Sequence, residues 1–234
     1  MEFLHKDLME YTSSPQVAAV SDPSFLSTTF AFFGLALAVT CTGVYAGFLM
    51  MVSSPELFSN PLVFYGAVLV ELILVFTSRS WSERLPFGYA LFALFALLSG
   101  FTLVPILLVA GAAGGVTLVF KALISTVSVF GAAALYGWTT HRNLQGLGGF
   151  LFMALIGLIV MGIVSIFLPW SNTLEMVVAG VTIVIFAGFT MVDVQRLQRF
   201  QTGNPLIAAI ALYLNFINLF ISILRLMMAF GNRR

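Results

Sequence analysis

Seven long apolar stretches, separated by short polar segments, occupy most of this chain. A helix needs roughly 17–25 apolar residues to cross the hydrocarbon core of a bilayer. The stretches are Phe25 to Met51, Leu62 to Ser78, Phe87 to Ala110, Val116 to Trp138, Leu147 to Leu168, Leu174 to Val192 and Leu206 to Phe230. The pattern predicts an all-α, polytopic membrane protein with seven transmembrane helices.

The last stretch differs from the others because it carries a polar stripe. Asn215, Asn218, Ser222 and Arg225 follow one another at spacings of three, four and three, which places them on one helical face. Polar side chains find no partners in hydrocarbon, so we expect this helix to lie in the centre of the bundle. Two readings of Arg225 stay open, a buried partner or an extended side chain that reaches the outer interface.

Asp193 and Asn215 form the most informative pair in the sequence. Their midpoint is residue 204, inside a turn formed by Gly203, Asn204 and Pro205. In an antiparallel helical hairpin, residues equidistant from the turn lie at matching depth, so we expect the two side chains to face each other. The alternative is that Asp193 caps the end of the sixth helix and pairs with Arg196.

Glu71 lies near the middle of the second stretch. A carboxyl group in a low-dielectric environment favours its neutral form. It would then hydrogen-bond a neighbouring helix, or else it lines a cavity as a proton or cation contact, as intramembrane acids often do.

Small residues predict where helices approach each other closely. Gly43 and Gly47 form one such patch, and Gly131 forms another with the alanines at 132–134.

Composition agrees with a membrane protein, since 60% of the 234 residues are hydrophobic and 8% are charged. A soluble domain has about 25% charged residues. A net charge of +1 argues against nucleic acid as a partner. Residues 1–24 are polar and are expected to form a flexible tail, with residues 25–234 as the seven-helix domain. The bilayer is the first partner that these features imply.

Basic residues in the short loops predict the orientation. They follow the second, fourth and sixth stretches: Arg79, Arg84, Arg142, Arg196 and Arg199. These loops and the N-terminal tail are therefore predicted to be cytoplasmic. A seventh full crossing places the C-terminus outside, although the chain ends in two arginines.

Recognisable catalytic motifs are missing from the sequence. It holds two histidines, His5 in the tail and His141 in a loop, and one cysteine, Cys41. We therefore expect no enzyme activity, no catalytic residue and no cofactor, and the sequence leaves a metal site undetermined.

Several stretches resemble the Bax inhibitor-1 (transmembrane Bax inhibitor motif) family. They are Phe186-Ala-Gly-Phe-Thr-Met-Val-Asp-Val-Gln-Arg-Leu197, Ala211-Leu-Tyr-Leu-Asn-Phe-Ile-Asn-Leu-Phe220, Ser99-Gly-Phe-Thr-Leu-Val-Pro-Ile106 and Leu135-Tyr-Gly-Trp-Thr-Thr-His-Arg-Asn-Leu144. Phe152-Met-Ala-Leu-Ile-Gly157 and the closing Phe230-Gly-Asn-Arg-Arg234 are similar to bacterial inner-membrane members. The resemblance implies seven helices with the last one central.

The resemblance also implies an activity, a pH-sensitive leak of cations, chiefly calcium. In the family it is attributed to two facing aspartates on the sixth and seventh helices, with a nearby arginine that locks the closed state. Asp193 matches the first aspartate, whereas Asn215 occupies the position of the second. Glu71 matches an acidic position of the second helix.

The closing arginine is a second departure from the family. Ser82 aligns with its position, and Arg79 and Arg84 are the candidates to replace it. Two functions therefore stay open. The first is a cation leak with Asp193, Asn215, Glu71, Asn218 and Arg225 along the pathway or gate. The second is a regulatory protein that binds another membrane complex, such as a membrane protease.

Overall fold

A computed structural model describes residues 23–84, 86–167, 171–200 and 203–231. Within these ranges the chain is helical and contains no strand. The helices are α2 (Pro23–Ser53), α3 (Pro55–Phe58), α4 (Pro61–Phe76), α5 (Ser78–Trp81), α6 (Phe87–Thr139), α7 (Gln145–Phe167), α8 (Asn172–Phe200) and α9 (Pro205–Gly231). The predicted tail lies outside the described residues, except for its last two positions.

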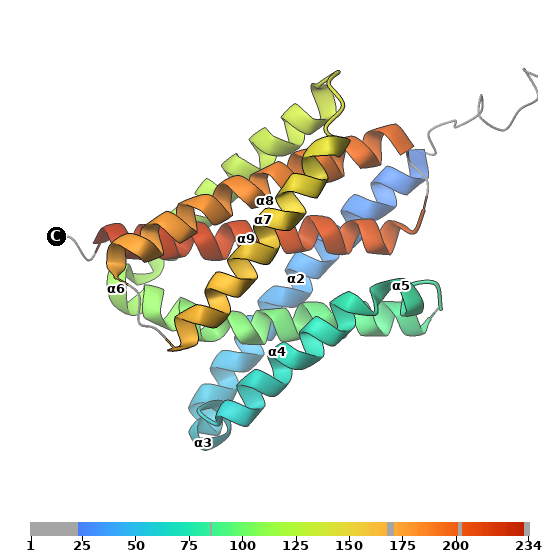
Figure 1. Cartoon of the computed structure of the whole chain (residues 1–234). Helices are drawn as coiled ribbons and strands as arrows, with labels where there is room; N and C mark the ends of the chain where they lie inside the picture. Colours follow the sequence, from blue (N-terminus) through green and yellow to red (C-terminus); the bar gives the residue numbers. More distant parts are fainter. Residues whose placement is uncertain (1–22, 85, 168–170, 201–202, 232–234) are drawn as a thin grey trace, which may run out of the picture.

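The third and fourth predicted stretches are merged into α6, which has 53 residues. A straight helix of that length would measure roughly 80 Å at 1.5 Å per residue, far more than the about 30 Å of a hydrocarbon core. The chain instead reverses direction at Gly115, where φ is 68° and ψ is −173° (Figure 1). The expected glycine-rich loop is therefore a break at a single residue, where a positive φ favours glycine.

In the described part of the chain, five helices are long and apolar enough to cross a membrane, namely α2, α6, α7, α8 and α9. The two legs of α6 correspond to two predicted crossings, while α4 has 16 residues and is shorter than a usual crossing helix. The all-helical membrane class is confirmed, and the count of seven crossings stays a prediction.

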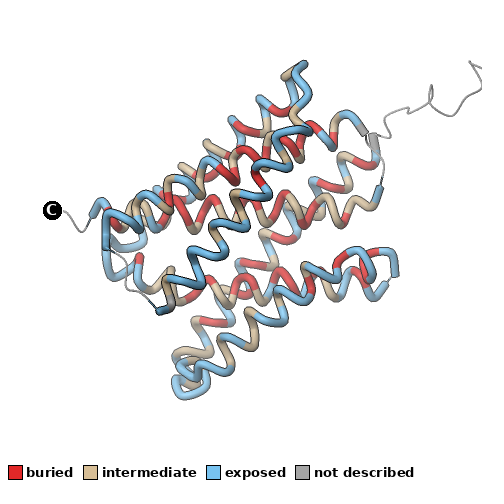
Figure 2. Tube along the Cα trace, viewed as in Figure 1, coloured by how far each residue is buried: buried red, intermediate tan, exposed pale blue. Residues whose placement is uncertain are grey.

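The last helix is the most buried of the five. Of the most apolar part of α9, 61% is buried, against 6% for α7, and Figure 2 shows the same contrast. α9 packs against α2, α6 and α8, whereas α7 packs mainly against α8. Figure 1 shows α9 in the middle of the molecule.

The arginine-bearing segments gather at one end of the bundle. Arg79 of α5 and Arg196 of α8 line one cavity with Phe25 at the start of α2. The Arg199 guanidinium donates to the carbonyl oxygens of His141 and Arg142 at 3.2 and 3.1 Å. The loops predicted to share one side of the membrane therefore meet in space.

Glycines bring α2 and α6 into backbone contact. A Cβ atom added at Gly43 would overlap the Leu97 carbonyl oxygen and lie 3.1 Å from the Gly100 Cα atom. A Cβ atom at Gly47 would lie 2.6 Å from a Val104 methyl carbon. The predicted close packing at Gly43 and Gly47 is confirmed.

The second predicted small-residue patch is wrong in its position. Gly131 is exposed, and a Cβ atom there would meet nothing within 4 Å. The close approach of α6 to α8 occurs at Gly137 instead, where a Cβ atom would lie 2.9 Å from the Met191 Cα atom.

We expect Gly43→Leu to destabilise the fold by about 1–3 kcal/mol or more, because the added side chain must separate two helix backbones. Gly34→Leu in the same helix is the matched control, since a Cβ atom at Gly34 meets nothing within 4 Å. Thermal unfolding of both variants in detergent measures the effect. Equal midpoints for the two variants would contradict the close approach.

Candidate functional site

Asp193 of α8 and Asn215 of α9 face each other across the last helical hairpin. The Asn215 amide nitrogen Nδ2 donates to the Asp193 carboxylate oxygen Oδ2 at 2.8 Å. Asn215 is buried and Asp193 is half-buried. The matching-depth prediction is therefore confirmed. α8 continues to Phe200, so Asp193 lies inside the helix and does not cap its end.

Asp193 lines a cavity of about 300 Å³ at the arginine-bearing end of the bundle. Arg79 and Arg196 also line it, with backbone and apolar groups around the α8–α9 turn. Among the described residues, no arginine or lysine nitrogen forms an ion pair with a carboxylate within 4 Å. Asp193 thus shares its cavity with two arginines and forms an ion pair with neither of them.

The two candidates for the closing arginine differ in position. Both side chains are exposed, but they differ in what they line. Arg79 lines the Asp193 cavity, whereas Arg84 does not line it. Ser82 is 2% exposed, and its hydroxyl has no hydrogen-bond partner among the described residues. Of these three positions, only Arg79 is placed to approach Asp193.

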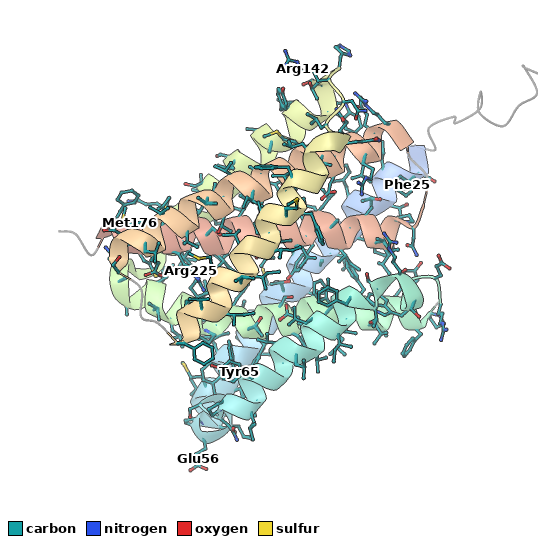
Figure 3. All side chains as sticks on the ribbon, viewed as in Figure 1. Phe25, Glu56, Tyr65, Arg142, Met176 and Arg225 are labelled. Atoms are coloured by element: carbon teal, nitrogen blue, oxygen red, sulfur yellow. The ribbon has the colours of Figure 1, made fainter. Side chains whose placement is uncertain are left out.

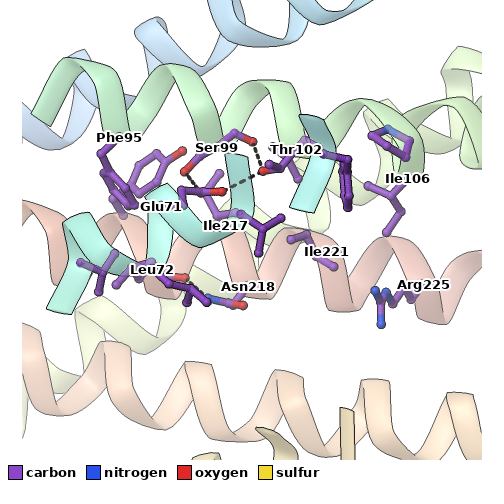
Figure 4. Close-up of a pocket in the computed structure, with 17 residues that line it drawn as sticks. Glu71, Leu72, Phe95, Ser99, Thr102, Ile106, Ile217, Asn218, Ile221 and Arg225 are labelled. Carbon is purple, nitrogen blue, oxygen red and sulfur yellow. Dashed lines mark hydrogen bonds between the residues drawn. The ribbon is translucent and has the colours of Figure 1, made fainter. Parts of the chain in front are cut away.

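Glu71 lines a different cavity of about 450 Å³, between α4, α6 and α9 (Figure 4). The Ser99 hydroxyl donates to its Oε1 atom, and the Thr102 hydroxyl donates to Oε2 at 3.1 Å. Both hydroxyls belong to α6, so Glu71 bonds a neighbouring helix and also faces a cavity. The two sequence interpretations of Glu71 are compatible in this geometry.

Tyr213 lines the same cavity as Glu71, and its side chain is completely buried. Its hydroxyl lies 2.6 Å from the Thr40 hydroxyl, which in turn lies 3.1 Å from the Ala96 carbonyl oxygen. This contact joins α9, α2 and α6 at one point. The sequence interpretation missed both side chains, because a tyrosine and a threonine in apolar stretches resemble ordinary packing residues.

The polar stripe of α9 divides along its length. Ser222 is buried, and its hydroxyl donates to the Asn218 carbonyl oxygen at 2.7 Å. Asn218 is half-buried and donates to the Leu214 carbonyl oxygen at 2.8 Å. Arg225 is exposed, which favours the reading of an extended side chain that reaches the interface over that of a buried partner. This part of α9 is not covered by α4 or α8 and borders a cavity on each side. Asn218 and Arg225 line both cavities.

The family model described as "Inhibitor of apoptosis-promoting Bax1" matches residues 22–232. The chain belongs to the Bax inhibitor family.

Several bacterial proteins are similar to this Bax inhibitor family member over most of their length. The inner membrane protein YbhL of Escherichia coli K12 is 36% identical over 76% of this chain and 78% of its own. An uncharacterized membrane protein of Streptococcus pyogenes serotype M1 is 36% identical over 73% of this chain and 76% of its own length. An uncharacterized protein of Helicobacter pylori J99 is 34% identical over 90% of this chain and 88% of its own length. The first of these relatives is named an inner membrane protein and the second a membrane protein.

Gln195 is a further polar residue of this Bax inhibitor family chain, and the sequence interpretation missed it by placing it in a loop. It is 2% exposed. Its Oε1 atom accepts from the Leu144 backbone nitrogen at 2.8 Å, and its Nε2 atom donates to the Arg142 carbonyl oxygen at 2.8 Å. Gln195 therefore ties α8 to the loop before α7, close to Asp193 in the same helix.

A resident metal site is not evident in the described part of the chain, which contains no group of three or more His, Cys, Asp or Glu side chains able to hold an ion. Asp193 and Glu71 each lie among hydroxyl, amide or guanidinium groups instead.

We expect Gln195→Leu to lower the stability by about 1–3 kcal/mol, because it leaves the Leu144 N–H and the Arg142 carbonyl without their buried partner. Gln145→Leu is the control, since Gln145 is exposed at the start of α7. Thermal unfolding and limited proteolysis of the 140–144 loop measure the effect. An unchanged loop in Gln195→Leu would contradict this role.

Proposed function

We propose that this protein gives cations, chiefly calcium, a low-conductance path across the inner membrane, with Asp193 and Asn215 at its control point. The observation that carries the proposal is the half-buried Asp193 carboxylate, bonded to Asn215 and open to a cavity at one end of the bundle. An ionisable group inside a membrane bundle that faces a cavity is a usual mark of an ion pathway. The proposal involves no catalytic residue and no cofactor.

The arrangement corresponds to a closed path. The Asp193 cavity and the Glu71 cavity have no lining residue in common. The buried side chain of Leu212 lies between them along α9, and the buried Tyr213 forms part of the wall of the Glu71 cavity. Opening would require α9 to move relative to α4 or α6, so that the cavities join and Glu71 and Asn218 become part of the path.

The Asp–Asn pair departs from the paired aspartates that the family resemblance implies. Two close carboxylates titrate as a pair, and one of them retains a proton to higher pH. An amide has no such proton, so the natural pair holds a single negative charge when Asp193 is ionised. We propose that this protein has a weaker pH response than a two-aspartate relative, with Arg79 as the closing arginine.

The second candidate is a regulatory protein that binds another membrane complex. The missing second carboxylate favours it, and so does α7, whose outward surface is largely uncovered by the rest of the protein. The ion-path proposal explains more of the structure, because it accounts for both cavities and for their acidic residues.

We expect Asn215→Asp to create a pH-dependent calcium leak in liposomes, since two carboxylates within about 4–6 Å repel each other once both are ionised. At low pH the pair shares a proton and stays together. At higher pH the doubly charged pair separates or recruits a cation.

The double variant Asp193→Asn with Asn215→Asp is the control, because it restores one carboxylate and one amide in exchanged positions. It should leak no more than the natural protein. If Asn215→Asp liposomes leak calcium like the parent between about pH 6 and pH 8, where a raised carboxyl proton is lost, the facing-pair mechanism is wrong. The interaction role would then be the better explanation.

We also propose that the N-terminus and the arginine-bearing end are cytoplasmic. In a Cys41→Ala background, cysteines at Ser80 and Asn143 should be protected from an impermeant thiol reagent in intact cells, while cysteines at Ser59 and Ala113 should react. All four positions are exposed in the structure. Labelling of Ser80 and Asn143 from outside would reverse the orientation.

A further inference from the structure

A third cavity, of about 480 Å³, lies at the opposite end of the bundle from the arginine-bearing loops. Its walls come from the end of α7, the first half of α8 and the second half of α9. The Asn172 amide donates to the Ala229 carbonyl oxygen at 3.3 Å, which ties the first residue of α8 to the end of α9. The charged residues of the cavity, Glu175 and Arg225, lie within about two turns of these helix ends.

Two opposite charges line this cavity, Glu175 of α8 and Arg225 of α9. Both side chains are exposed, and they form no ion pair with each other within 4 Å. Figure 3 shows Arg225 and Met176, the neighbour of Glu175, at the same end of the molecule. Each charge is thus available to a third molecule that carries both signs.

The uncharged polar side chains of the wall present acceptors. The hydroxyls of Ser165, Thr182 and Ser222 each donate to a backbone carbonyl oxygen in the preceding turn of their own helix, at 2.6, 2.7 and 2.7 Å. Their hydrogens are used, so the lone pairs of the hydroxyl oxygens remain for a donor. A wall with one guanidinium, one carboxylate and several acceptors suits a ligand with an anionic and an ammonium group.

We infer that this cavity binds the zwitterionic headgroup of an aminophospholipid, with the phosphate on Arg225 and the ammonium on Glu175. A guanidinium binds phosphate through two parallel hydrogen bonds. The ammonium offers three hydrogens, which the Glu175 carboxylate and the hydroxyl oxygens accept. An ethanolamine headgroup carries both signs on one short bridge, so it can contact two opposite protein charges that line one cavity without pairing with each other.

The membrane setting favours a lipid as the source of this headgroup. An arginine in the hydrocarbon costs roughly 2.5–3.5 kcal/mol at mid-depth, and it lowers this cost by extending to the headgroups. Arg225 lies close to the end of α9 and is exposed, so phosphate groups are within its reach. The site shares Asn218 and Arg225 with the Glu71 cavity, whereas Asp193 and Asn215, the control point of the proposed ion path, do not line it.

Native mass spectrometry of the full chain, released from micelles with defined lipids, tests the inference. The natural protein should retain phosphatidylethanolamine about five- to ten-fold better than phosphatidylglycerol with the same acyl chains, because only the former has an ammonium for Glu175. Arg225→Gln should lower the retention of both lipids about ten-fold. Glu175→Gln should abolish the preference while phosphatidylglycerol binding persists.

Arg84→Gln and Glu83→Gln are matched controls, because both residues are exposed at the other end of the bundle. They should leave retention and preference unchanged. Equal retention of the two lipids by the natural protein, or an equal loss in the Arg84→Gln control, would overturn the inference. If soluble phosphoethanolamine raises the thermal midpoint and phosphatidylethanolamine does not, the ligand is a water-soluble zwitterion and the lipid assignment is wrong.

Discussion

Hydrocarbon offers no hydrogen bonds, so each buried polar side chain on the central helix α9 must find its partner within the protein. The fold is arranged around this constraint. Asn215 bonds Asp193 of α8, and Tyr213 bonds Thr40 of α2. Ser222 bonds the backbone of α9 itself. The contacts with Asp193 and Thr40 hold α8 and α2 against α9 at defined depths, because a shift by one turn would leave these buried groups unpaired.

The same constraint separates the ionisable groups into different environments. Asp193 opens to a cavity with two arginines, and Glu71 to a cavity with two hydroxyl donors, while Arg225 is exposed and lines both the Glu71 cavity and the third cavity. Backbones approach each other closely at Gly43 and Gly137, and a cavity of about 270 Å³ between α2 and α6 is lined by apolar and aromatic side chains. The cavities that contain ionisable residues are therefore the places where a cation or a headgroup can be accommodated.

Membership of the Bax inhibitor family gives the ion-path proposal its context, while the residues of this chain give it its particular form. An aspartate opposite an asparagine retains the geometry of a facing pair and removes one titrating group. Arg79 lies on the wall of the same cavity, and the serine at the aligned arginine position is buried without a partner. The charge balance around Asp193 is thus set by residues from three separate segments.

The sequence by itself determined the helical membrane class, the gathering of arginine-bearing loops at one end and the contact between Asp193 and Asn215. These follow from apolar length, loop charge and equal distance from a turn, which are local or pairwise properties of the chain. Only the tertiary structure decided that α6 reverses at a single glycine, that Gln195 is buried against a distant loop and that Arg225 is exposed. The reason is physical: the environment of a side chain depends on which helices cover it, and the spacing of residues within one helix indicates which face is buried but not which segments cover that face.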